Sequence, residues 1–259
     1  GHALAVDGRI TVGDEGTGAE GNGILVFDGS VTTTGGMILG AGPGTSGLIS
    51  LFSGTSWQNL SEAATSIGFD GEGLLVADAA FVSHTGPVSL GAFEAGRGRI
   101  ELENASSMLT TDSLHVGLRG AGELLVASGS GLSTGPVVIG DRGGSVGSVR
   151  LTGAGSRWDI VGDLVIGDDG AAVLEVVDQA FLCMGGTSNV GPQGSVITDG
   201  TIRVEFVAPC AVAAREARQA ADAGLLVAGL TIAEGGELVA EALEVGDGGV
   251  VDGAGALAV

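Results

Sequence analysis

Carboxylates recur just after a short aliphatic-glycine phrase, and they are the residues of this chain best suited to bind a cation. The five of them are Asp14, Asp70, Asp141, Asp168 and Asp247. Ca²⁺ takes carboxylate and turn carbonyl oxygens as ligands, so a column of such residues along one edge of a repetitive fold is a candidate calcium site. The tandem Gly-Gly-x-Gly-x-Asp repeat of known calcium-binding solenoids is absent. We favour the alternative, in which each Asp bonds its own turn.

Catalysis needs ionisable groups that converge on one face, and the sequence does not assemble them. A glycoside hydrolase needs two clustered carboxylates, whereas a polysaccharide lyase needs a base and a cation that neutralises a uronate. Neighbouring residues such as Asp168 and Asp169 point to opposite faces of a strand. His84 and His115 are 31 residues apart, which does not match the repeat described below. No Gly-x-Ser-x-Gly phrase joins a strand to a helix. We therefore expect no catalytic residues and no enzyme, and keep a lyase or hydrolase as the alternative.

Two pairs of rarer residues offer further candidates. Cys183 and Cys210 are 27 residues apart, about one repeat, and are a possible disulfide if the protein is exported. The alternative is two small buried hydrophobic side chains. Trp57 and Trp158 each follow a Gly- and Ser-rich phrase. A platform for stacking a sugar or another partner is one interpretation, and we favour the other, an indole packed over a corner of the fold.

These residues sit on a repeat whose start is an aliphatic residue followed by Gly. The spacing between successive repeat glycines is 23 to 28 residues over the first eight repeats, and the last step is 55. Short stretches with period-2 alternation lie between the glycines, which is typical of β-strands and turns. A period of this length predicts a solenoid. We predict an all-β chain folded as a parallel β-helix with about 25 residues per coil. The aliphatic members, expected to point inward, are Val12, Leu39, Ile67, Leu90, Val116, Ile139, Ile166, Val190 and Val245.

One segment departs from the repeat. Residues 208–224 are rich in Ala, carry charges at helical spacing and end at Gly224, which predicts a short helical insertion. Arg215, Glu216 and Arg218 are its exposed candidates for contact with a partner. We expect residues 1–3 to be a tag scar and the start of the chain, and residues 4–259 to be a single β-helix domain that contains the insertion.

Composition excludes some partners. The chain of 259 residues has a net charge of −21, with 31 acidic residues against 10 Arg and no Lys. Such a chain cannot track phosphates along nucleic acid, and it is repelled by anionic membranes. Its hydrophobic fraction of 44% nevertheless argues for a packed fold, although 51 residues are Gly. Neither a transmembrane run nor a signal peptide is visible, and we expect no cofactor.

Several phrases resemble the repeats of bacterial autotransporter passenger regions, which belong to type V secretion. They are Ile166-Gly167-Asp168-Asp169-Gly170, Leu151 through Trp158, and Gly248 through Leu257. The resemblance implies a right-handed β-helix that is carried by an outer-membrane β-barrel in the parent protein and is displayed on the cell surface or released. It also implies an adhesive role toward a host or bacterial surface protein or glycan. We therefore expect a secreted or surface-displayed, non-catalytic passenger fragment; the alternatives are the lyase or hydrolase and a mechanical stalk.

Overall fold

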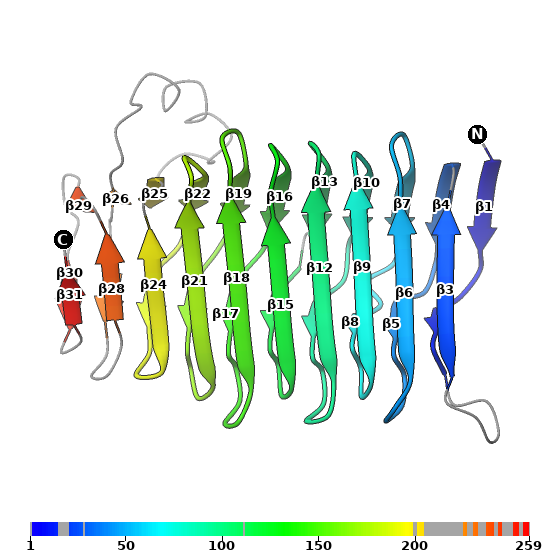
Figure 1. Ribbon diagram of the computed structural model, residues 1–259, viewed down its shortest axis with the longest axis horizontal. Helices are drawn as coiled ribbons and strands as arrows, with labels where there is room; N and C mark the ends of the chain where they lie inside the picture. The colour runs from blue at the N-terminus through cyan, green and yellow to red at the C-terminus, as the bar shows by residue number, and fades with distance from the viewer. Residues whose placement is uncertain are drawn as a thin grey trace.

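The protein folds as a solenoid of parallel strands, seen side by side along a rod in the computed structural model (Figure 1). The structure describes residues 2–14, 21–27, 29–110, 112–198 and 201–204, together with the later strands given below. Each coil contributes one strand to each of three sheets, here called A, B and C, so that a strand pairs with its counterpart in the next coil. The predicted all-β solenoid with about 25 residues per coil is thereby confirmed.

Sheet A has 11 strands. In spatial order they are β1 (His2–Val6), β4 (Gly29–Thr33), β7 (Ser56–Asn59), β10 (Phe81–His84), β13 (Ser107–Thr110), β16 (Gly131–Thr134), β19 (Arg157–Ile160), β22 (Phe181–Met184), β25 (Thr201–Val204), β26 (Leu225–Leu226) and β29 (Leu243–Glu244).

Sheet B has 10 strands, each of them only three residues long. They are β2 (Ile10–Val12), β5 (Met37–Leu39), β8 (Thr65–Ile67), β11 (Val88–Leu90), β14 (Leu114–Val116), β17 (Val137–Ile139), β20 (Leu164–Ile166), β23 (Ser188–Val190), β27 (Leu230–Ile232) and β30 (Val251–Gly253).

Sheet C also has 10 strands and contains the longest of the fold. They are β3 (Asn22–Phe27), β6 (Ser46–Leu51), β9 (Glu72–Asp78), β12 (Arg97–Glu103), β15 (Ala121–Val126), β18 (Val146–Thr152), β21 (Ala171–Val177), β24 (Gly194–Thr198), β28 (Glu237–Ala240) and β31 (Ala256–Ala258).

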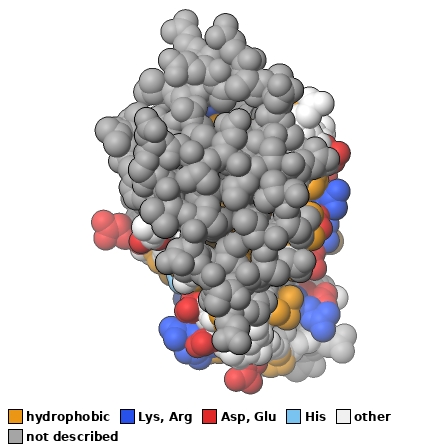
Figure 2. All heavy atoms as spheres, turned by 90° about the vertical axis from the view of Figure 1, so that its left-hand side faces the viewer, with side chains coloured by type: hydrophobic (Ala, Val, Ile, Leu, Met, Phe, Trp, Pro, Cys, Tyr) orange, Lys and Arg blue, Asp and Glu red, His pale blue; other side chains and the backbone are white. Residues whose placement is uncertain are grey.

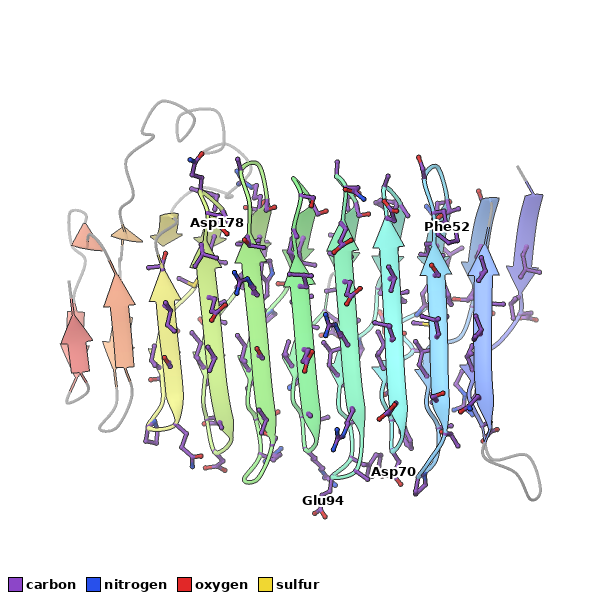
Figure 3. All side chains as sticks on the ribbon, viewed as in Figure 1. Phe52, Asp70, Glu94 and Asp178 are labelled. Carbon is purple, nitrogen blue, oxygen red and sulfur yellow. The ribbon has the colours of Figure 1, made fainter. Side chains whose placement is uncertain are left out.

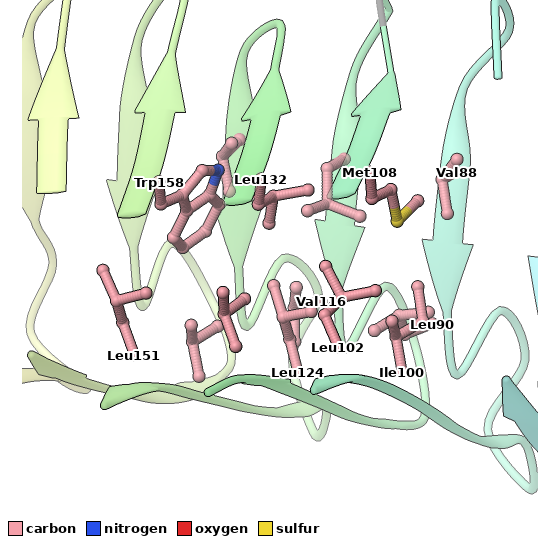
Figure 4. Close-up of a cluster of buried hydrophobic side chains, with 14 of the residues drawn as sticks. Val88, Leu90, Ile100, Leu102, Met108, Val116, Leu124, Leu132, Leu151 and Trp158 are labelled. Atoms are coloured by element: carbon pink, nitrogen blue, oxygen red, sulfur yellow. The ribbon is translucent and has the colours of Figure 1, made fainter. Parts of the chain in front are cut away.

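The interior consists of aliphatic ladders. Leu90 is the Cα partner of Val116, Val116 of Ile139, and Ile139 of Ile166. All four are at most 1% exposed, so the prediction that these repeat residues point inward is confirmed. Sheets A and C contribute the inward side chains that pack against this ladder. Figure 4 shows Leu102, Leu124 and others beside it. Period-2 alternation in each strand places one side chain in the core and the next outside.

The repeat glycines lie where sheet B turns into sheet C. From Gly13 to Gly167 the repeat glycines have φ between +63° and +76°, a conformation that is costly for residues with a Cβ atom. A Cβ on Gly68 would also run into the backbone of Arg97 in the next coil. At this corner Gly is therefore required both by the positive φ and by the close approach of the next coil.

The predicted helical insertion, residues 208–224, lies outside the described residues, as do Arg215, Glu216 and Arg218. The described residues contain no helix, and hence none that is long and apolar enough to cross a membrane. Strand β1 begins at His2, so residues 2 and 3 of the expected tag scar pair with Gly29 and Ser30.

Candidate functional site

The turns from sheet B to sheet C alternate between two lengths. After Gly40, Gly91 and Gly140 the next strand begins six residues on, whereas after the intervening glycines, such as Gly68, it begins four residues on. Each longer turn lies over the shorter turn of the following coil. The amide of Ala121, for example, donates to the carbonyl of Gly96 at 2.9 Å. The corner between sheets B and C, which we call the B–C corner, therefore has a two-coil repeat.

Charged side chains gather at the B–C corner in the middle of the rod. Glu94 and Arg142 lie on the longer turns and Arg119 on the shorter turn between them. Together with Gly143 they line a hollow of about 400 Å³. Figure 3 shows Asp70 and Glu94 pointing outward at this edge, opposite to Phe52 and Asp178. In the end-on view of Figure 2, acidic and basic side chains both appear along the lower rim.

A histidine-aspartate pair supports one wall of this corner. His115 points outward from β14, and its Nδ1 lies 2.8 Å from Oδ2 of Asp141 on the turn after β17. Arg142 Nε lies 3.2 Å from the other carboxylate oxygen of Asp141. Asp141 is 7% exposed, so this carboxylate is buried and shared between two partners. It therefore ties two successive coils together and orients Arg142.

An aromatic pair supports the opposite wall. Phe69 and Phe93 have ring centroids 4.6 Å apart. The guanidinium carbon of Arg119 lies 5.8 Å from the centroid of Phe93, within the range of a cation–π contact. Among the described residues, no carboxylate forms a salt bridge with Arg119. The ring therefore positions this charge, which is in salt-bridge contact with none of the described carboxylates.

Part of the sequence signal for this site is one register position, which Phe93, Arg119 and Arg142 share. The second residue after each repeat glycine is, in successive coils, Asp70, Phe93, Arg119, Arg142 and Asp169. Asp141 belongs to the carboxylates that follow the repeat glycines, whereas no local motif marks Glu94, Arg119 or Arg142. The Asp141 contact with His115 spans 26 residues, and a search for local motifs does not detect such a contact.

The candidate calcium ligands, the less favoured interpretation of these carboxylates, do not gather into one site among the described residues. Asp14 and Asp168 are exposed, and Asp70 stands one position further from its glycine than Asp141 does. Asp141 itself is occupied by His115 and Arg142. No group of three His, Cys, Asp or Glu side chains suited to a metal is found among the described residues. Asp247 lies outside them.

The two tryptophans are packed in the core, as the favoured interpretation has it, although on a strand and not over a corner, and the alternative of a partner contact is wrong. Trp57 is 1% exposed and Trp158 is fully buried, each on the inner face of sheet A. The indole Nε1 of Trp158 donates to Thr134 Oγ1 at 3.0 Å. Strand alternation turns both indoles inward, and a sugar cannot reach them.

Cys183 occupies an outward register position of β22, where its Cα partner is the partly exposed Asp159, yet it is fully buried. It is disulfide-bonded. Cys210 lies outside the described residues, so the pairing of the two cysteines stays a prediction.

A second histidine lies inside the solenoid. His84 is 1% exposed, and its Cα partners in the adjacent coils are the buried Asn59 and Thr110. Its Nδ1 lies 3.4 Å from Thr65 Oγ1. Burial lowers the pKa of His84 to about 4, because the charged imidazolium would lose its hydration. His84 is thus a neutral core residue at the end of β10 in sheet A.

Comparison with known proteins leaves the family open. The chain is 27% identical over 146 residues to the uncharacterized protein YuaQ of Escherichia coli (strain K12), a match that covers 56% of this chain and 9% of that protein. The chain thus spans less than a tenth of the length of this relative. No family model matches, and no solved structure matches.

Proposed function

We propose that the chain is part of a secreted or surface-displayed β-helical passenger with an adhesive or structural role and no catalysis. In this proposal the coil is right-handed, and an outer-membrane β-barrel of the parent protein carries the passenger to the bacterial surface. The observation that carries the proposal is the stack of parallel coils along the described part of the chain. Its interior is filled by aliphatic ladders, and its net charge is −21.

Such a stack suits a displayed rod for physical reasons. Each coil buries its apolar face only against its neighbours, so stability accumulates along the rod without a separate domain core. A large negative charge keeps an extended protein soluble and self-repelling. The same properties suit a mechanical stalk, which needs no ligand site. The charged hollow at the B–C corner favours adhesion over a stalk.

Surface labelling of cells that produce the parent protein tests the proposal. Antibodies raised against this chain are expected to label intact cells or the medium, and external protease is expected to abolish the labelling of intact cells. A cytoplasmic protein serves as the control for leakage. Labelling that appears only after lysis would contradict the proposal.

The rival function is a β-helical polysaccharide lyase or glycoside hydrolase. The observation in its favour is the convergence of His115, Asp141, Arg119 and Arg142 at one corner, since a lyase needs a base and a cation. Incubation with polyuronates and neutral glycans, followed by ultraviolet absorbance for unsaturated products and by an assay for reducing ends, distinguishes the two. Turnover that the His115→Gln variant lacks would establish the rival.

A further inference from the structure

We infer that the hollow lined by Arg119 and Arg142 binds the carboxylate of an acidic sugar, a uronate carried on a surface glycan. The two arginines come from adjacent coils and line the same hollow. Planar guanidinium groups match carboxylates through paired, charge-assisted hydrogen bonds. This inference deepens the adhesive function proposed above and rests on it.

Both arginines are held in place by neighbours outside the ligand position. Phe93 lies beneath the Arg119 guanidinium, and Phe69 supports Phe93. Asp141 holds Arg142 through Nε, and His115 holds Asp141. Arg142 nevertheless keeps a side chain that is 64% exposed. Because their neighbours restrain them before binding, less conformational entropy is lost when a carboxylate arrives.

Two further groups in the lining favour a sugar acid over a simple inorganic anion. Glu94 also lines the hollow and can accept hydrogen bonds from hydroxyl groups, while it repels a second negative charge. Gly143 lines the same hollow, and a Cβ placed there would meet nothing within 4 Å. The site thus offers two donor side chains for a carboxylate, one acceptor for hydroxyl groups, and open space. These groups complement a uronate, which carries one carboxylate and several hydroxyl groups on a ring.

The surroundings limit the charge that the site accepts. Asp141 is already occupied by His115 and Arg142, but Asp168 and Asp169 stand exposed on the next turn of the B–C corner. A ligand with a single carboxylate per sugar avoids most of this repulsion, whereas a divalent sulfate does not. Binding is expected to weaken as salt is added, because the arginines are solvent-accessible.

Titration of the whole chain with small ligands tests the inference. Galacturonate and glucuronate are added at constant ionic strength, and binding is followed by calorimetry and by the arginine Nε–H signals in nuclear magnetic resonance spectra. Galactose and sodium sulfate are the comparison ligands. We expect saturable binding of the uronates, with the largest shifts at Arg119 and Arg142, and weaker binding of both comparison ligands. Sulfate that binds as tightly as the uronates would overturn the assignment to a sugar acid.

Variants locate the site. Arg119→Gln and Arg142→Gln are each expected to weaken uronate binding by about tenfold or more, since each removes a charge-assisted contact. Glu94→Gln is expected to narrow the preference for uronate over sulfate. The matched control is Arg150→Gln on the outer face of sheet C, where Arg150 pairs with Glu175 at 3.0 Å, and binding should be unchanged. Equal losses in the Arg119 and Arg150 variants, with native melting curves in both, would overturn the inference.

The outcomes separate the inference from the function on which it rests. Surface labelling without uronate binding would leave the display proposal standing and overturn the site. Uronate binding that the Arg119 and Arg142 variants lose would support the site even if intact cells were not labelled, and in that case only the display proposal would fail.

Discussion

His115 and Asp141 lie in successive coils, and their side chains meet across the gap between them at 2.8 Å. The contact joins an outward position of sheet B to a turn of the B–C corner, so it fixes the turn that carries Arg142. Asp141→Asn keeps the shape and removes the charge. We expect a loss of about 1–2 kcal/mol in the free energy of unfolding, because a buried charged hydrogen-bond acceptor is replaced by a neutral one. Urea unfolding measures it, and the exposed Asp168→Asn is the control, with a change near zero.

The inward ladder makes a sharp prediction about side-chain truncation. Ile139→Ala should cost about 2–5 kcal/mol, because the methyl groups removed leave a cavity among stacked neighbours. Val138→Ala, one residue away on the outer face of the same strand, should cost well below 1 kcal/mol. Thermal unfolding of both variants gives the comparison. Equal costs would show that the alternation in β17 is assigned to the wrong faces.

Two glycines with the same backbone conformation differ in what surrounds them. Gly44 has φ +76° and open space where a Cβ would lie, whereas Gly68 has φ +68° and the Arg97 backbone in that place. Gly44→Ala should therefore cost only the left-handed strain, about 1–2 kcal/mol. Gly68→Ala should cost clearly more, because adjacent coils must also move apart. The free energies of unfolding in urea check the order, and a smaller cost at Gly68 would contradict the corner packing.

His84 makes stability depend on pH. Its pKa is about 4 in the folded protein against 6.5 in the unfolded chain, so the unfolded state binds more protons between these values. Stability should therefore fall by about 1.4 kcal/mol per pH unit as pH drops from about 6.5 toward 4, with no contribution above about pH 7. His84→Asn places in the ladder the residue that the preceding coil already has there. Above pH 7 the difference between the unfolding free energies of the two proteins should be constant. Below pH 6 it should change with pH, and a difference that stays constant there would contradict the buried neutral state.

The parts of this fold that sequence predicts are those that recur in every coil. Leu90, Val116 and Ile139 each precede a repeat glycine, and periodicity alone turns them inward in register. The burial of Trp158 is harder to predict, because a single indole does not recur in every coil. It follows from alternation along β19, and the sequence does not mark where that strand begins. The hollow was missed for a different reason. Arg119 and Arg142 share a register position in adjacent coils, but Arg119 lies on a shorter turn than Glu94 and Arg142, and the hollow that these side chains line follows only from the strand bounds.

The register between neighbouring coils is the central claim, since every ladder and the B–C corner depend on it. Ser148 in β18 and Val173 in β21 are Cα partners on the outer face of sheet C, although 25 residues separate them in sequence. In a background without Cys183 and Cys210, cysteines at 148 and 173 should form a disulfide readily, because adjacent strands lie about 4.8 Å apart. Cysteines at 148 and 177, in the same two strands but out of register, should not. Efficient cross-linking of 148 with 173 alone is the predicted result, and cross-linking of 148 with 177 in its place would contradict the coil.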